Sequence, residues 1–244
     1  MTIQAWTDLS ILVGPSELAG HGKNVTLAVE CAPLDKTNFQ SAGYVELTGG
    51  SKSGTLSLDF MQDMAAAGPD DSLWDLLGDS GVPKSLCTPS ADGSVAYLCA
   101  GVPVSYKPID GSSGELAMAA VSLKSSGVIA RGRLLHPKGA TARTSSSTGT
   151  GRQLGAVAAG KSLYAALHVP EVSGTTPSLT VKVQSDDNSG FTSATDRITF
   201  TAATARTFQW ASVAGAITDD YWRITYTISG TDPSFKFAVT AGIV

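Results

Sequence analysis

Apolar and polar residues alternate along several segments in the first half of the chain. The alternation is cleanest over residues 25–31 and 55–60, and it continues less regularly over residues 102–106, 116–123 and 128–135. A period of two is typical of a strand that turns one face to the core and the other to solvent. These segments therefore predict half-buried strands of an antiparallel sheet.

One short segment between these strands has helical spacing. Either Asp70 or Asp71 is placed to cap its first turn, and Gly78 follows its last apolar residue. The apolar stripe consists of Leu73, Trp74, Leu76 and Leu77. We expect a short helix that packs this stripe against the sheet.

The second half of the chain contains six further short runs. They cover residues 162–169, 179–184, 197–201, 208–213, 221–229 and 235–241. Short alternating strands separated by Gly, Asp, Asn and Pro are typical of a β-sandwich. In the fifth run Trp222 shares a face with Ile224, which favours a core position for Trp222.

The segment between the two halves has little to bury. Over residues 137–155 the only large apolar residue is Leu154, and Ser, Thr and Gly predominate. Such a composition predicts a flexible linker over residues 141–155. The expected organisation is an all-β chain with one short helix: a β-sandwich or barrel domain over residues 1–140 and a β-sandwich domain over residues 156–244.

The charge distribution differs between the two halves. Charged residues make up 16% of the chain, against about 25% in a typical globular protein. Residues 1–140 carry nine Lys and Arg against fourteen Asp and Glu, while the remainder carries eight against seven. A chain of net charge −4 with no basic stripe does not favour tight binding of nucleic acid.

Features of targeting are also missing from the sequence. No apolar run approaches the roughly 18 residues that a membrane helix needs, so we expect no membrane insertion. The first ten residues lack the basic and apolar regions of a signal peptide. Three cysteines without such a signal are expected to be reduced thiols.

One segment matches a phosphate-binding motif in form. Residues 155–162 read GAVAAGKS and fit G-x-x-x-x-G-K-[ST]. The motif binds phosphate only where a helix follows the loop, because the amides at the helix N-terminus hold the phosphates. Here the following SLYAALHV alternates like a strand, which favours a connection that enters the first strand of the second domain.

No other pattern predicts catalysis or a bound cofactor. The histidines, at positions 21, 136 and 168, are too far apart for a familiar metal-binding spacing. Neither a G-x-S-x-G elbow nor a recognisable order of Ser, His and acid is present. We therefore expect no enzyme activity, no metal and no cofactor.

Three smaller features have both a structural and a functional interpretation. If a two-residue turn at Asp92-Gly93 closes a hairpin, Cys87 lies opposite residue 98 and Cys99 opposite residue 86, so the thiols occupy opposite faces and cannot bridge. The sequence DDNSG at residues 186–190 could hold calcium, but without a downstream Glu an ordinary turn is favoured. Trp210, Tyr221 and Trp222 could form a platform for a sugar, but core packing is favoured for Trp222.

Two stretches resemble the tail proteins of bacteriophages. Residues 25–63, with the motif LDKTNF at 34–39, are similar to the opening of the major tail (tail tube) proteins of long-tailed phages. The second half resembles a sandwich domain appended to tail proteins of phages, particularly those that infect actinobacteria. That resemblance is carried by LHV at 167–169, SDDN at 185–188, DRITF at 196–200 and YWR at 221–223.

This resemblance implies a structural protein of the virion. Six copies would form a ring, and stacked rings would form the tube through which DNA is ejected. The implied partners are further copies of the chain and the tape measure, tail terminator and baseplate proteins, and the chain would be made in the host cytoplasm. The alternative is a virion module that binds carbohydrate or the host surface.

Two groups of residues have candidate roles, the first from the resemblance and the second from strand alternation and the charge of DNA. Residues 34–53 would reach neighbouring subunits, with the contact made by Leu34, Asp35, Lys36, Thr37, Asn38, Phe39 and Tyr44; the alternative is a solvent-exposed hairpin tip without a partner. In the strand at 55–60, Leu56, Leu58 and Phe60 are expected in the core. Thr55, Ser57 and Asp59 are then candidates for the wall of the DNA channel, where a neutral or acidic lining would not retain DNA. The alternative is that Asp59 is solvated on the tube exterior, because alternation gives the face of the strand but not the side of the barrel to which that face belongs.

Overall fold

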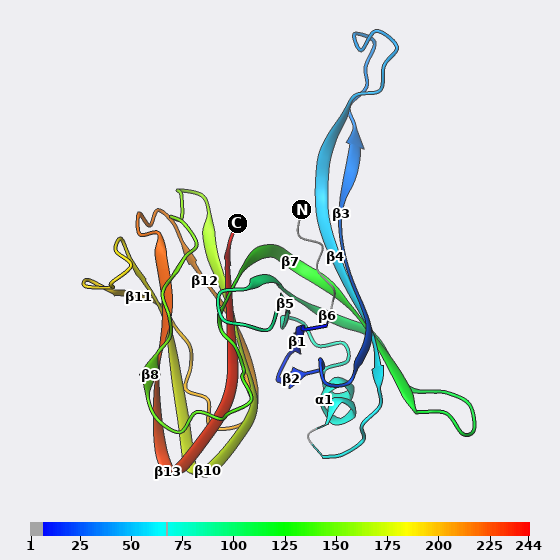
Figure 1. The fold of residues 1–244 in the computed structure, drawn as a ribbon. Coiled ribbons are helices and arrows are strands. Elements are labelled where there is room, and N and C mark those ends of the chain that lie inside the picture. Colours follow the sequence, from blue (N-terminus) through cyan, green and yellow to red (C-terminus); the bar gives the residue numbers. More distant parts are fainter. Residues whose placement is uncertain (1–6, 67) are drawn as a thin grey trace.

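The computed structural model describes residues 7–66 and 68–244, and its elements are almost all strands. They are β1 (Ser10–Val13), β2 (Ser16–Glu17), β3 (Gly22–Asp35), β4 (Leu47–Met61), α1 (Pro69–Asp75), β5 (Val82–Thr88), β6 (Val95–Asp110), β7 (Met118–His136), β8 (Ser147–Thr148), β9 (Arg152–Gln153), β10 (Ser162–Asp186), β11 (Thr195–Thr199), β12 (Thr207–Ala214) and β13 (Tyr221–Ile243). The expected all-β class with one short helix is confirmed. We call β1–β7 with α1 the first lobe and β8–β13 the second lobe (Figure 1).

The first lobe is one curved antiparallel sheet. Its strands follow the order β3-β4-β7-β6-β5-β1-β2, and α1 packs against β2 and β6. Its core contains Ile11, Val13, Leu18, Leu56, Leu58, Phe60, Leu73, Leu76, Val82, Leu86, Ala119, Val121 and Leu123. Leu56, Leu58 and Phe60 are buried while Ser57 and Asp59 are exposed on the opposite face, which confirms the alternation that the sequence predicts.

The hairpin of β3 and β4 extends far beyond the rest of the first lobe (Figure 1). Its strands pair from Gly22 and Phe60 at the base to Asp35 and Leu47 near the tip. Residues 34–53 were expected to form a loop, but residues 47–53 continue β4 and only residues 36–46 connect the strands. The alternating pattern becomes weak in this region because both faces of the hairpin are exposed.

The second lobe is a sandwich built around two very long strands. β10 and β13 pair with each other over most of their length, and both bend at register shifts between His168 and Ser178. The first half of β10 also pairs with β12 and the last residues of β10 pair with β11. The two layers enclose a separate core that includes Leu163, Leu167, Val181, Val183, Trp222, Ile224, Phe235 and Phe237.

The lobes are joined by a ladder of hydrogen bonds. The end of β7 pairs with β13, with Leu134 opposite Thr240 and Arg133 opposite Ala241. The sheet of the first lobe therefore continues into the second. Leu135, which belongs to β7, packs in the core of the second lobe.

Residues 141–155 differ from the flexible linker that their composition predicts. β8 pairs with Thr225 and Tyr226, and β9 pairs with Tyr221 and Trp222, so the segment runs along the edge of β13. Backbone groups make these contacts, and the side-chain pattern does not report them. The domain limits at residues 140 and 156 stay predictions.

The helix α1 also differs in detail from expectation. Gly68 is its N-cap, and the Asp70 carboxylate instead accepts hydrogen bonds from the Tyr106 hydroxyl (2.6 Å) and the Gln62 amide (2.9 Å). Leu73 and Leu76 are buried, but Trp74 is 62% exposed and Leu77 is 43% exposed. A helix of two turns contacts the core along one narrow face, so half of the predicted stripe stays in solvent. Within residues 7–66 and 68–244, no helix combines the length and the apolar character needed to cross a membrane.

Candidate assembly surfaces

The tip of the β3–β4 hairpin is ordered by its own polar groups. Asp35 accepts a hydrogen bond from the Thr37 amide (2.8 Å), and the Thr37 hydroxyl accepts one from the Glu46 amide (2.9 Å). Hydrogen bonds from Thr37 also hold the pKa of Asp35 below its usual value. At the turn, the Asn38 side chain accepts from the Gln40 amide (2.9 Å). The tip is therefore a shaped projection.

Apolar side chains on this projection face solvent. Phe39 is fully exposed and Tyr44 is 77% exposed. The other exposed apolar residues of the hairpin are Val29, Leu34, Val45 and Leu47. Exposed apolar groups gathered on one element usually mark a contact surface. All seven residues predicted for the inter-subunit contact lie at or beside the tip, although Leu34 and Asp35 belong to β3.

Besides the two-residue strand β2 at one end, the sheet of the first lobe has two long edges along which no other described strand pairs. β3 pairs with β4 and with no other described strand, which leaves 14 residues with one free side. β6 pairs with β5 only as far as Gly101, so no described strand lies along the far side of residues 102–110, although the Pro103 carbonyl oxygen there accepts a hydrogen bond from the Gly78 amide (3.0 Å). Pro103 and Pro108 lack an N–H group, so a ladder on this edge would rely mainly on residues 104–107. The segments β3, β4, 118–124 of β7 and 102–110 of β6 form one four-stranded sheet with an open strand on each side.

One face of this four-stranded sheet is polar and uncovered by other described elements. The predicted wall residues Thr55, Ser57 and Asp59 share this face, and Asn24 donates a hydrogen bond to Asp59 (3.3 Å). Sequence reasoning missed the neighbouring lysines: Lys124 lies opposite Thr55. Lys107, opposite Ala120, is on the same side. The irregular register between β6 and β7 concealed the position of Lys107. With these lysines the face carries both signs of charge and is not purely neutral or acidic.

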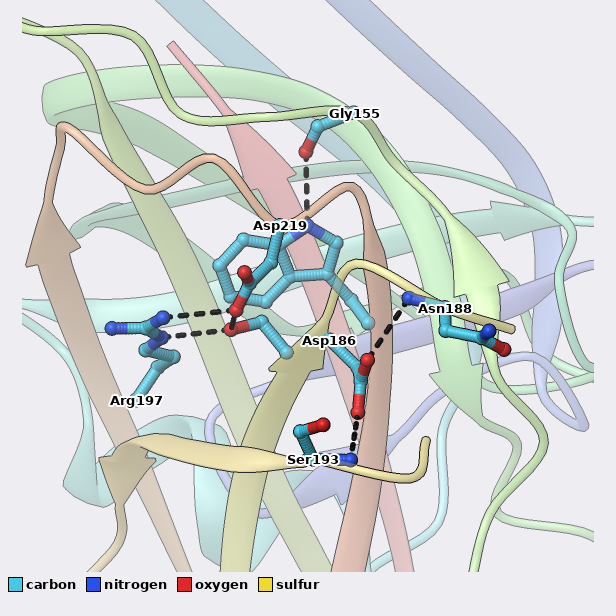
Figure 2. Close-up of polar contacts among 8 residues, drawn as sticks. Gly155, Asp186, Asn188, Ser193, Arg197 and Asp219 are labelled. Atoms are coloured by element: carbon cyan, nitrogen blue, oxygen red, sulfur yellow. Dashed lines mark hydrogen bonds and ion pairs between the residues drawn. The ribbon is translucent and has the colours of Figure 1, made fainter. Parts of the chain in front are cut away.

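The acidic loop of the second lobe is a turn (Figure 2). Asp186 accepts hydrogen bonds from the backbone amides of Asn188 (2.9 Å) and Ser193 (2.7 Å), so both of its oxygens are occupied. This confirms the turn expected at residues 186–190. Next to it, Asp219 binds Arg197 (2.9 Å), and hydrogen bonds from Ser185 and then Arg197 lower the pKa of Asp219.

Trp222 lies in the core, as the alternation predicts. Its side chain is fully buried, and its indole N–H donates a hydrogen bond to the Gly155 carbonyl oxygen (2.9 Å; Figure 2). Gly155 opens the segment that matches the phosphate-binding motif. The last residue of that segment, Ser162, begins the strand β10, so the expected connection into a strand is confirmed.

The cysteines are free thiols. Cys87 pairs with Ala96 and Cys99 with Lys84, which places Cys87 and Cys99 on opposite faces as predicted. The register differs by two from the expected one because residues 89–94 connect the strands instead of a two-residue turn. Burial raises the pKa of Cys87 to about 12, so this thiol is not reactive.

Comparison with known proteins gives remote likenesses. No family model matches the sequence, and no curated protein matches it. Among solved structures, a chain from the virion of a native gene transfer agent particle is similar over 53% of this chain and 98% of its own, with 18% identity and a TM-score of 0.43. A chain from the sheath/tube terminator of an extracellular contractile injection system is similar over 54% of this chain and 97% of its own, with 10% identity and a TM-score of 0.43. The SPP1 Dit protein, a hub of the adsorption apparatus of phages that infect Gram-positive bacteria, is similar over 97% of this chain and 99% of its own, with 12% identity and a TM-score of 0.34.

Proposed function

We propose that this chain is a structural subunit of a phage-type tail. Six copies form a ring, rings stack into a tube, and DNA passes through the tube during ejection. The observation that carries this proposal is the four-stranded sheet with an open strand on each side, because a long unpaired edge is a template for pairing with another chain.

The two open edges belong to different strands, β3 and β6. A contact between them is heterologous, and a heterologous contact closes into a ring when the rotation per copy divides a full turn. The number six comes from the resemblance of residues 25–63 to tail tube proteins. In such a ring the four-stranded sheets would join into a continuous barrel.

The projecting hairpin supports stacking. Phe39 and Tyr44 are large aromatic residues held away from the body of the chain, and aromatic side chains dominate the energetics of many interfaces. We place their contact on a neighbouring subunit. The other partners we propose for such a tube are the tape measure, tail terminator and baseplate proteins of a virion.

The polar face of the four-stranded sheet is the proposed wall of the channel. Thr55, Ser57 and Asp59 would face DNA, with Lys107 and Lys124 on the same face. Six copies of Asp59 would form a ring of carboxylates that offsets Lys124, and Lys107 forms an ion pair with Asp110 (2.8 Å), so DNA would pass without specific binding.

Electron microscopy of the purified protein tests this proposal. We expect rings or tubes, and a variant without residues 36–41 should remain folded but form no tubes. A matched control deletes the same number of residues from the exposed loop 111–117. If the wild-type protein forms neither rings nor tubes under any assembly condition, the proposal is wrong. If the deletion variant forms normal tubes, the hairpin is not the connector.

A second candidate function is binding of carbohydrate on the virion surface. Tyr164 and Trp210 stack at 5.7 Å between ring centroids and are both half-buried at the edge of the second lobe. Stacked aromatic rings can bind a sugar face, but Trp222 cannot contribute because it is buried. A stable monomer that binds cell-wall glycan, with binding lost in Trp210→Ala, would support this second function.

A further inference from the structure

A narrow crevice opens at the base of the projecting hairpin. Its walls come from β3 and β4 on one side and from β5, β6 and β7 on the other, with a lining that includes Leu27, Leu56, Lys84, Leu86, Tyr97 and Ile129. The enclosed space is only about 10 Å³. A large side chain would therefore lie across the mouth of the crevice and would not enter it.

The crevice contains an ammonium group without a partner. Lys84 is 2% exposed, and its Nζ atom has no hydrogen-bond partner among the residues that the structure describes. Burial lowers the pKa of Lys84. A buried cation in apolar surroundings is costly unless a carboxylate lies close to it, so this place favours an acidic partner.

The exposed face of the hairpin continues the same surface. Leu27, Val29 and Cys31 follow one another on one face of β3, and Lys52 lies opposite Cys31 on β4. Val29 is 52% exposed, and Cys31 and Lys52 are also exposed. We call Val29, Cys31, Lys52 and the mouth of the crevice the hairpin surface. It is apolar with positive charge.

A surface of complementary character lies on α1. Trp74 and Leu77 are exposed, and Asp75 and Asp79 adjoin them in the sequence. We call residues 74–79 the helix surface. It is apolar with negative charge.

The helix surface is held firmly in place. The amide of Gly78 donates a hydrogen bond to the Pro103 carbonyl oxygen (3.0 Å), and Asp70 accepts one from Tyr106. Buried Leu73 and Leu76 anchor the same segment to the core. Trp74 and Leu77 are therefore presented on a rigid support, which lowers the entropic cost of binding.

We infer that the helix surface of one copy docks on the hairpin surface of a second copy. The inference rests on the proposed function and specifies a contact within the tube. The hairpin projects away from the first lobe, and α1 lies at the opposite end (Figure 1). The contact therefore runs head to tail and repeats from copy to copy, with Trp74 and Leu77 covering Val29 and with Asp75 or Asp79 near the lysines.

Cross-linking through the native thiol tests this contact. Cys31 is exposed, whereas Cys87 and Cys99 are buried, and burial raises the pKa of both buried thiols. In the Trp74→Cys variant, a short bis-maleimide added to assembled protein should give a ladder of covalent dimers, trimers and larger species, because a head-to-tail contact propagates. Adding Cys31→Ser should abolish the ladder. Ser189→Cys, with a new thiol in an exposed turn of the second lobe, should give none; should Trp74→Cys fail to fold, Leu77→Cys serves in its place.

Charge reversal gives an independent measurement. Lys52→Glu and Asp75→Lys should each reduce the assembled fraction at least tenfold at low salt, and the double variant should recover most of it. The control Asp187→Lys makes the same charge change in the second lobe and should assemble normally. Two outcomes would overturn this contact and leave the proposed function intact. In the first, the Trp74→Cys variant forms rings or tubes but the bis-maleimide gives no ladder. In the second, the single charge variants assemble like the wild-type protein. A ladder in the absence of any ring or tube would support the contact and contradict the proposed function.

Discussion

The Nε2 atom of His168 lies 2.9 Å from the hydroxyl oxygen of Ser85, across the seam between the two lobes. On its other side the imidazole Nδ1 lies 2.7 Å from the Gly14 carbonyl oxygen. Because a carbonyl only accepts, Nδ1 carries the proton and Nε2 accepts a hydrogen bond from Ser85. Ser85 in turn accepts one from the Thr240 hydroxyl (2.8 Å). Four buried polar groups are thus satisfied by one another, and the seam has a single favoured geometry.

Replacing His168 with Leu should destabilise the whole chain. Without the imidazole, the Gly14 carbonyl oxygen loses its donor and the Ser85 hydroxyl loses its acceptor, so Ser85 and Thr240 have only each other as partners. Each buried polar group without a partner costs about 1–3 kcal/mol. We expect the free energy of unfolding, measured by urea titration, to fall by about 2–4 kcal/mol. The control His21→Leu, at a half-exposed position, should change it by less than about 0.5 kcal/mol. Equal effects of the two substitutions would contradict this account of the seam.

Stability should also fall as the solution becomes acidic. Burial lowers the pKa of His168 to about 4, and burial together with nearby Arg143 lowers the pKa of His136 to about 4. Between pH 6.5 and 4 the unfolded chain therefore binds more protons than the folded chain, so stability is full above pH 6.5 and is lost as the pH falls toward 4. Each histidine can contribute up to about 3 kcal/mol to this loss.

Urea titrations at pH 7.0 and pH 4.5 measure this dependence. In His168→Leu the difference between the two pH values should be roughly half of that in the wild-type protein, because one of the two buried histidines is gone. An unchanged difference would show that His168 does not titrate on unfolding.

The sequence pattern predicted those parts of the fold in which one face of a strand is buried and the other is exposed to solvent. This holds for residues 55–60 and for the buried position of Trp222. It failed at the seam, because residues 165–170 of β10 are buried on both faces and no alternation marks His168 as special. It also failed for residues 141–155, where backbone pairing along β13 replaces side-chain burial.

The candidate contact and channel residues stay predictions. The motif at residues 34–39 lies at the hairpin tip, where Phe39 is exposed. Lys107 was missed because it reaches the polar face through the irregular pairing of β6 with β7, and Lys124 was missed because alternation alone does not give the pairing of β7 with β4. Open strand edges cannot be predicted from alternation, since an edge strand and a central strand share the same period.

Gly132 should be essential where β7 meets β13. A Cβ atom at this position would lie 1.9 Å from the carbonyl oxygen of Ala241, so the two strands could not approach as they do. We expect Gly132→Ala to lower the free energy of unfolding by roughly 1–3 kcal/mol. Gly20→Ala, where a Cβ atom meets nothing within 4 Å, is the matched control and should have little effect. A neutral Gly132→Ala in urea titration would mean that the ladder between the lobes does not form as described.

The last prediction concerns Asp59 and the passage of DNA. Asp59 is exposed on the polar face of the four-stranded sheet, and Leu58 and Phe60 beside it are buried, so a substitution at Asp59 should leave the fold intact. DNA carries one negative charge about every 1.7 Å of helix axis, so six new lysines in every ring would add up to strong retention along a stacked tube. Asp59→Lys should therefore assemble normally but slow DNA ejection, most clearly at low salt, where screening is weak. Asp59→Asn, which removes the charge without reversing it, should have a much smaller effect, and Asp187→Lys should have none. Ejection kinetics from particles carrying each variant give the measurement, and a normal rate for Asp59→Lys at low salt would place this face outside the channel.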